Sequence, residues 1–371
     1  MNSKTIGIKY ICPSGNSGYA EAAKDYIIGL SQTDIPLTVS LMKMDNSNYL
    51  QGERNQIVNK FVNKVINYNK VIIHSTPEFW NKIYIEEKTK NKDVEVIGMV
   101  VWETSKIDDR WIEWINEVDR VVVPCFHNKE VFLNCNIIKP IEVVPHIFKP
   151  LVETTLKLSE VNNNDFVFYT IGQWSVRKGV EDTIKTYLNT FNDNDKVCLI
   201  VKTFKSNYAE EEKQKIKNRV NSLISQFQHP AKVVLITDEC TDEEISAIHK
   251  TGSCYVSLCK SEGWGLGAFD AAGLGKSVII TGYGGPVDFL LQETVKNELI
   301  SVEGMEWIPW YNNTQKWGNP DLKHASELML LAKENQNNDN CKSVLKQQSE
   351  KIQKEYSYSF ITQKLISFLN R

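Results

Sequence analysis

The chain has 371 residues, of which 42% are hydrophobic and 24% are charged, and its formal net charge is -3. This length fits two domains of moderate size, and the composition excludes a chain that is disordered throughout. The weakly acidic balance argues against nucleic acid as a partner, because such proteins carry a basic surface.

The cysteines and the hydrophobic runs bear on three questions: a zinc site, a membrane span and the cellular compartment. The eight cysteines form no CxxC pair, so no zinc site is expected. The N-terminus lacks the apolar core of a signal peptide, and no run approaches the roughly 20 apolar residues of a membrane span. We therefore expect a cytoplasmic protein without a transmembrane segment, and peripheral contact with a membrane stays open.

The first half alternates short β-rich runs with helical patterns, which is typical of βα units and parallel sheets. Near-continuous apolar runs such as VIGMVVW suit strands that are covered on both faces. Between the first two strands, residues 18–30 form one apolar helical face, and the preceding loop contains Gly15 and Gly18. The expected strands are residues 5–12, 37–42, 71–74, 94–102 and 121–123.

This pattern stops near residues 145–150, and after a polar connector at 151–164 a second series of strands begins. The sequence therefore predicts an α/β protein with two Rossmann-like domains, residues 1–150 and 151–347, facing each other across a cleft. Ligands of such sheets bind outside the carboxyl ends of the strands. A C-terminal helix, residues 348–371, is expected to cross back to the first domain. The second series comprises residues 166–171, 197–201, 233–237, 254–258, 277–281 and 299–302.

The segment SLCKSEGWGLGAFDAAGLGKSVIITGYGGPVDFL, residues 257–290, carries the most chemical information. A strand is followed by a glycine-rich turn and then by a helix, an order in which backbone N–H groups can bind an anion. Glu262 and Asp270 are eight residues apart, roughly 12 Å if that stretch were wholly helical. That spacing suits the two ends of an extended polyhydroxyl ligand better than one reacting bond, which needs about 5–9.5 Å.

This segment resembles the signature E-G-[FW]-G-L-P-x-x-E-A-M-A-x-G-x-P-V-I, with a following Gly-Gly turn, of the family-4 retaining glycosyltransferases (glycosyl transferases group 1). These enzymes have the GT-B fold. The resemblance implies that Glu262 contacts the donor sugar and that Asp270, at the position of the family's second glutamate, binds the ribose hydroxyls. Gly267 replaces the usual proline. The other donor-binding positions that it implies are Gly263, Trp264, Gly265, Leu266, Gly284 and Gly285.

A second segment, TIGQWSVRKGVEDTIKTY, resembles the glycine-arginine and lysine-glycine motif whose two cations hold the donor phosphates. Lys178 matches the lysine, and Gly172 and Gly179 match the glycines. Gln173 occupies the arginine position, and Arg177 is a candidate to restore the missing charge. Lys202, after the next strand, resembles a lysine that some members carry. Fixed cations suit a diphosphate leaving group, whose negative charge grows as its bond to the sugar breaks, so Lys178 and Glu262 are the candidate catalytic residues.

The N-terminal half resembles the same family more loosely. PSGNSGYA is similar to the first glycine loop and makes Gly15, Asn16, Gly18 and Tyr19 candidates for the cleft, and the run that begins VVWETS adds Glu103. VVPHIFKP is similar to the hinge between the domains, where His146 is expected to be a hinge residue. The tryptophans, Trp264 included, are expected in the core or the cleft wall.

The resemblance implies retaining, metal-independent transfer from a nucleoside diphosphate-sugar, without a further cofactor, to a sugar, lipid, protein or small-molecule acceptor. Gln173 and Asp270 keep open a catalytically weak or inactive protein that binds a nucleotide sugar. A nicotinamide-dependent oxidoreductase is disfavoured, since PSGNSGYA lacks the third glycine of G-x-G-x-x-G. An epimerase or phosphorylase of the same fold is a further alternative.

Overall fold

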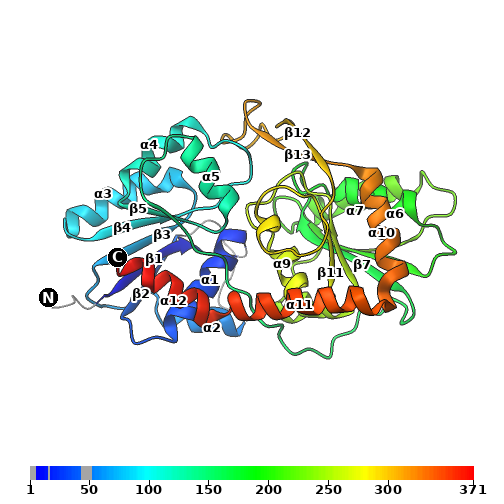
Figure 1. Ribbon diagram of the computed structural model, residues 1–371, viewed down its shortest axis with the longest axis horizontal. Coiled ribbons are helices and arrows are strands. Elements are labelled where there is room, and N and C mark those ends of the chain that lie inside the picture. The colour runs from blue at the N-terminus through cyan, green and yellow to red at the C-terminus, as the bar shows by residue number, and fades with distance from the viewer. Residues whose placement is uncertain (1–5, 16, 43–51) are drawn as a thin grey trace. The chain divides into compact units, whose positions relative to one another are not determined.

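The computed structural model describes residues 6–15, 17–42 and 52–371. The chain divides into two compact units. The N-terminal unit comprises Met1–Lys149 together with Gln353–Arg371, and the C-terminal unit comprises Pro150–Ile352. Each unit is built around its own parallel sheet with helices on both faces (Figure 1).

The N-terminal unit has a six-stranded parallel sheet in the order β2-β1-β3-β4-β5-β6. The five expected strands are present, although the first begins at Ile8 and the fourth ends at Met99, so both are shorter than predicted. A sixth strand, β6, was not predicted, and it is only three residues long. The strands are β1 (Ile8–Pro13), β2 (Leu37–Met42), β3 (Lys70–His74), β4 (Glu95–Met99), β5 (Arg120–Val123) and β6 (Ile141–Val143). The helices are α1 (Gly18–Ser31), α2 (Glu53–Asn59), η1 (Pro77–Phe79), α3 (Trp80–Lys90), α4 (Asp109–Glu117) and α5 (Phe126–Asn134).

The end of the chain also belongs to this unit, as α12 (Tyr358–Leu369) packs against α1 (Figure 1). The Tyr358 hydroxyl donates to the Asp25 carboxylate at 2.7 Å. Residues 348–371 are not one helix: α11 (Asp339–Glu355) ends, and Ser357 caps α12 by accepting a hydrogen bond from the Phe360 N–H. An extended capping residue interrupts the helical pattern at that point.

The C-terminal unit has a five-stranded parallel sheet in the order β11-β10-β7-β8-β9. The predicted strand at residues 299–302 is wrong as a member of this sheet, because β12 pairs only with β13 in an antiparallel hairpin. The strands are β7 (Phe166–Gln173), β8 (Val197–Phe204), β9 (Lys232–Ile236), β10 (Cys254–Ser257), β11 (Ser277–Ile280), β12 (Asn297–Ser301) and β13 (Lys316–Pro320). The remaining helices are α6 (Val180–Thr190), α7 (Glu210–Ile224), α8 (Asp242–Thr251), α9 (Leu266–Gly273), η2 (Gly285–Asp288), α10 (Leu322–Glu334) and η3 (Asn335–Asn337).

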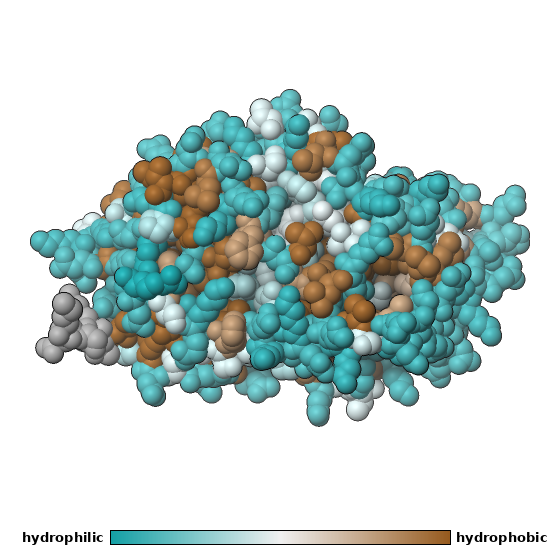
Figure 2. Space-filling view, viewed as in Figure 1, coloured by the Kyte–Doolittle hydropathy of each residue, from teal (hydrophilic) through white to brown (hydrophobic). Residues whose placement is uncertain are grey.

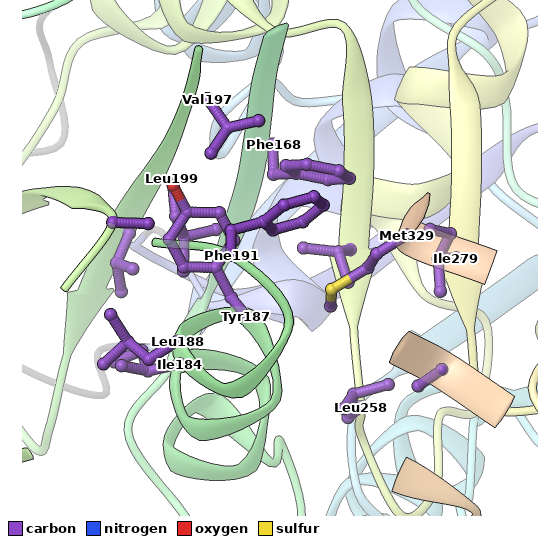
Figure 3. Packing of buried hydrophobic residues seen from close by; sticks show 14 of the residues in the cluster. Phe168, Ile184, Tyr187, Leu188, Phe191, Val197, Leu199, Leu258, Ile279 and Met329 are labelled. Atoms are coloured by element: carbon purple, nitrogen blue, oxygen red, sulfur yellow. The ribbon is translucent and has the colours of Figure 1, made fainter. Parts of the chain in front are cut away.

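The two faces of this sheet are covered by different helices. On one face, side chains of β7 and β8 meet those of α6, α7 and α10, with Phe168, Tyr187 and Phe191 at the centre (Figure 3). Neighbouring residues of a strand point to opposite faces, so Tyr169 faces the other side, where its hydroxyl pairs with His249 of α8 at 3.0 Å. The sheet is therefore doubly wound.

The surface drawn in Figure 2 is mostly hydrophilic, and its hydrophobic residues form separate patches. Among the helices of the described ranges, none combines the length and the apolar character that a membrane span requires.

Candidate functional site

Two loops of the C-terminal unit lie side by side at the carboxyl edge of its sheet. One follows β7 and the other follows β10, its neighbour in the sheet. The Lys260 N–H donates to the Arg177 carbonyl at 2.7 Å and so joins the loops directly. Ligands of doubly wound sheets bind at this edge, so the two motifs that the sequence singles out meet where a ligand is expected.

Glu262 stands at the centre of this arrangement and is only 8% exposed. The Lys178 Nζ lies 2.6 Å from its Oε1, and the Arg177 Nη1 lies 3.4 Å from its Oε2. Burial alone would raise the pKa of Glu262, but the Lys178 and Arg177 cations outweigh burial and hold the pKa below its ordinary value of 4.5. We call these three residues the Glu262 site.

The glycines of the motif fold the backbone around Glu262. Gly284 forms a parallel bridge with Glu262, and the Gly285 N–H donates to the Glu262 carbonyl at 2.9 Å. Gly284 has a φ of +87°, and a Cβ there would lie 2.2 Å from the Glu262 carbonyl oxygen. A side chain is therefore excluded by both conformation and contact, and the Gly-Gly turn holds the site carboxylate in position.

The helix α9 begins after Glu262, not before it. Gly265, in the left-handed conformation with a φ of +86°, ends the turn, and the helix starts at Leu266. Glu262 and Asp270 thus do not share a helix, and the spacing of 12 Å that a wholly helical stretch would give does not apply. Asp270 is half-buried in the second turn of α9, and Gly267 packs against the ring of Tyr255.

Trp264 anchors the turn from inside the unit. Its side chain is 3% exposed, and its ring centroid lies 5.1 Å from those of Phe269 and Phe289. This position agrees with the expectation of a core residue, so any contact of Trp264 with a donor would come from its backbone.

Two other predicted donor ligands, Gln173 and Lys202, have different surroundings from Lys178. Gln173 turns away, because its Nε2 donates to the Lys205 carbonyl at 2.7 Å. Lys202 lies one strand further along the sheet, on β8, opposite Ile171 of β7. Gly172, by contrast, lies beside Lys178, whose Cδ would be 3.9 Å from an added Cβ. Arg177, the candidate to restore the missing charge, points to the same carboxylate as Lys178.

In the N-terminal unit the predicted residues gather at the carboxyl edge of the sheet, after β1 and β4. The Tyr19 hydroxyl donates to the Val101 carbonyl at 2.8 Å and accepts from the Val101 N–H at 3.1 Å. Glu103 is half-buried two residues further on. Gly15 has a φ of +114°, and Gly18 is the first residue of α1. Asn16 lies outside the described residues.

Sequence reasoning gave little weight to a buried polar cluster in the N-terminal unit. The Tyr10 hydroxyl lies 2.8 Å from His74 Nδ1, and the Tyr26 hydroxyl lies 3.3 Å from His146 Nδ1. Burial lowers the pKa of both imidazoles, to about 3 for His146. His74 is therefore a packed, hydrogen-bonded histidine, and for Tyr10 and Tyr26 the only signal in the sequence was their place in apolar runs.

A cavity of about 660 Å³ lies at the opposite, amino end of the C-terminal sheet. Its walls include Phe166, Ser277, Leu331 and Val344, from β7, β11, α10 and α11, and none of the residues of the Glu262 site. We place the candidate site at the carboxyl edge and not in this cavity, because the convergent charges and the glycine turns are there. Within the described part of the chain, no three His, Cys, Asp or Glu side chains gather so as to hold a metal ion.

We compared the chain with known protein families, curated sequences and solved structures. No protein-family model matches the chain, and no curated protein sequence matches it. Solved structures do match. HepE of Anabaena, in complex with UDP and glucose, is 12% identical with a TM-score of 0.66, over 98% of this chain and 99% of that one.

Two further structures match over the same extent. A glycosyltransferase of Rickettsia africae is 12% identical with a TM-score of 0.69, over 98% of each chain. Sucrose-phosphate synthase of Thermosynechococcus elongatus is 11% identical with a TM-score of 0.66, again over 98% of each. The chain therefore has the GT-B fold, as the sequence predicted.

Proposed function

We propose that the protein is a glycosyltransferase that moves a sugar from a nucleoside diphosphate-sugar to an acceptor. The observation that carries this proposal is the Glu262 site: a buried, ionised carboxylate held by Lys178 and Arg177 at the carboxyl edge of a doubly wound sheet. The fold supports it, because HepE, which has the same fold, binds UDP and glucose.

The charges of the site suit this reaction. Two cations against one carboxylate leave a positive charge that can bind the donor diphosphate and stabilise it as the leaving group. An ionised carboxylate accepts hydrogen bonds and donates none, so Glu262 is suited to sugar hydroxyls. Asp270, in the adjacent helix, has the same chemistry and is our candidate for the ribose hydroxyls.

The finer features of the proposal rest on the sequence resemblance. We propose hexosyl transfer with retention of configuration and without a metal, with Lys178 and Arg177 neutralising the diphosphate. Residues 151–347 would hold the donor, residues 1–150 the sugar, lipid or protein acceptor, and residues 348–371 would return to the first domain. The Gly15, Gly18, Tyr19 and Glu103 region is the proposed acceptor side, and a cytoplasmic location is part of the same proposal.

The test is release of nucleoside diphosphate from a panel of UDP-, GDP- and ADP-sugars, with a chelator present and with and without an acceptor extract. We expect release from one donor, stimulated by acceptor and lost in Glu262→Ala. Glu181→Ala is the matched control, since Glu181 also pairs with an arginine and a lysine but lies on α6, outside the site. Full activity of Glu262→Ala would contradict the proposal.

The second candidate is a protein that binds a nucleotide sugar without transferring it. Gln173 favours this candidate, because the family's arginine position carries no charge here and its amide is bound to the Lys205 carbonyl. Tight donor binding without release, across many acceptors, would support this candidate over the transferase.

A further inference from the structure

Lys202 is a buried lysine at the carboxyl end of β8. It is 4% exposed, and its ammonium lies over two aromatic rings, 4.9 Å from the centroid of Tyr208 and 5.6 Å from that of Phe204. The two rings are 5.1 Å apart and inclined by 33°. Both rings are only partly buried, so this group of lysine and aromatic side chains reaches the surface of the sheet edge.

The described residues offer this ammonium no ion pair within 4.0 Å and no hydrogen-bond acceptor. Burial lowers the pKa of Lys202, and the carboxylates of Asp238, Glu239 and Glu244 oppose that shift from a greater distance. Its Nζ keeps some contact with solvent, so a ligand can reach this ammonium and supply the acceptor that no described residue provides.

The position of Lys202 relates this group to the Glu262 site. Lys202 is paired with Ile171 of β7, the residue before Gly172, and Gly172 lies beside Lys178. Adjacent strands are about 4.8 Å apart, so Lys202 is one strand along the same edge. An extended ligand whose diphosphate is held by Lys178 would place a further part of itself against Lys202, Phe204 and Tyr208.

The surroundings favour a neutral, planar group over a phosphate. Besides the buried ammonium, three acidic residues lie on the turn after β9 and at the start of α8: Asp238, which Lys213 neutralises at 2.6 Å, Glu239 and Glu244. The negative charges of Glu239 and Glu244 would oppose a phosphate there. A nucleobase carries no charge, and its face can stack on an aromatic ring.

We propose that Lys202 recognises the nucleobase of the donor by donating a hydrogen bond to an exocyclic carbonyl oxygen. This inference rests on the proposed function and names the substrate class as uridine or guanosine diphosphate-sugars. Lysine has three donors and no acceptor. Cytosine and adenine carry an amino group where uracil and guanine carry that carbonyl. With either of these two bases, the Lys202 ammonium and the amino group would both be donors and would face each other without an acceptor.

The test is a set of binding titrations of UDP, CDP, GDP and ADP with a chelator present. UDP differs from CDP, and GDP from ADP, at the exocyclic group in question. The wild-type protein should prefer the carbonyl base in at least one pair by roughly 10-fold or more, as a hydrogen bond from a charged donor allows. Lys202→Met should remove that preference and leave binding of the amino base nearly unchanged, whereas Lys205→Met, an exposed lysine three residues away, should keep it.

A second variant guards against misfolding of the first. In Lys202→Gln the amide can accept as well as donate, so the preference should shift toward CDP or ADP. A preference that survives both substitutions would overturn the inference. So would an equal loss for all four nucleotides, which would make Lys202 a phosphate ligand, or wild-type binding of all four with equal affinity. Each of these outcomes leaves the proposed function intact, whereas wild-type protein that binds none of the nucleotides would overturn the proposed function as well.

Discussion

Replacing Lys178 by methionine measures how much the ion pair with Glu262 contributes to the stability of the C-terminal unit. The side chains of Lys178 and Glu262 are 23% and 11% exposed, so the pair is largely buried. Breaking a fully buried pair costs about 3–5 kcal/mol. Arg177 stays 3.4 Å from the carboxylate and Lys178 is partly solvated, so we expect roughly 2–3 kcal/mol. At about 2–4 °C per kcal/mol for a unit of this size, Tm should fall by roughly 5–10 °C.

Differential scanning calorimetry at pH 7.5 measures this shift. The double variant Lys178→Met with Glu262→Gln removes the buried carboxylate, while Arg177 keeps its hydrogen bond to the Ser261 carbonyl at 3.0 Å, so it should recover part of the loss without recovering donor binding. Lys185→Met is the matched control, because its pair with Glu181 is more exposed, with side chains 40% and 29% exposed, and solvated pairs contribute about 0–1 kcal/mol. An unchanged Tm for Lys178→Met would refute the reasoning.

The pH dependence of stability tests the same ion pair in a second way. The pKa of Glu262 is depressed in the folded protein, so the stability it contributes is present above the ordinary value of 4.5 and is lost as pH falls through the folded value. Without Lys178, burial dominates and the carboxyl takes up a proton more readily. The difference in Tm between wild type and Lys178→Met should therefore shrink as the pH is lowered below about 5.

Two further predictions concern the glycine turn and the buried histidines. Gly284→Ala should lower stability by more than about 2 kcal/mol, because its φ is +87° and the new Cβ would overlap a carbonyl oxygen, whereas Gly18→Ala, with open space around it, should change Tm little. His74 and His146 have depressed pKa values, so protonation favours the unfolded chain and stability of the N-terminal unit is lost as pH falls below 6.5. His146→Gln should reduce that loss by roughly 1.4 kcal/mol per pH unit between pH 6.5 and 4, and an unchanged acid titration of unfolding would contradict this.

The architecture could be predicted because the strands of a doubly wound sheet are short apolar runs between helical patterns. The prediction failed where that signal is absent. The hairpin strand β12, with the sequence NELIS, is mostly exposed and pairs with one partner only, although Leu299 and Ile300 resemble the start of a buried strand. The β6 strand is three residues long, below the length at which a period can be recognised.

The residues of the candidate site could be predicted from motifs, but their partners could not. Gln173 occupies the motif's arginine position and Arg177 was the candidate to restore the missing charge, but only the loop conformation directs Arg177 to Glu262 and Gln173 to Lys205. These contacts join residues 85 and 32 positions apart, and no local pattern encodes them. Lys202 was included because it resembles a lysine that some family members carry, and its place over the rings of Phe204 and Tyr208 is visible only in the fold.

The cavity at the amino end of the C-terminal sheet had no signal in the sequence. Its walls come mainly from α10, α11 and the edge strand β11, with Phe166 at the start of β7. Hydrophobic positions such as Leu331 and Val344 are exposed there, and in the sequence they are indistinguishable from core positions of an amphipathic helix.

The most direct test of the nucleotide-sugar site is hydrogen exchange of the wild-type protein with and without saturating nucleoside diphosphate, followed peptide by peptide. We expect slower exchange in residues 172–179 and 261–270, which carry Lys178, Arg177 and Glu262, and no such protection in Lys178→Met. Protection confined to the walls of the amino-end cavity, or none with any nucleotide, would contradict the assignment of the donor site.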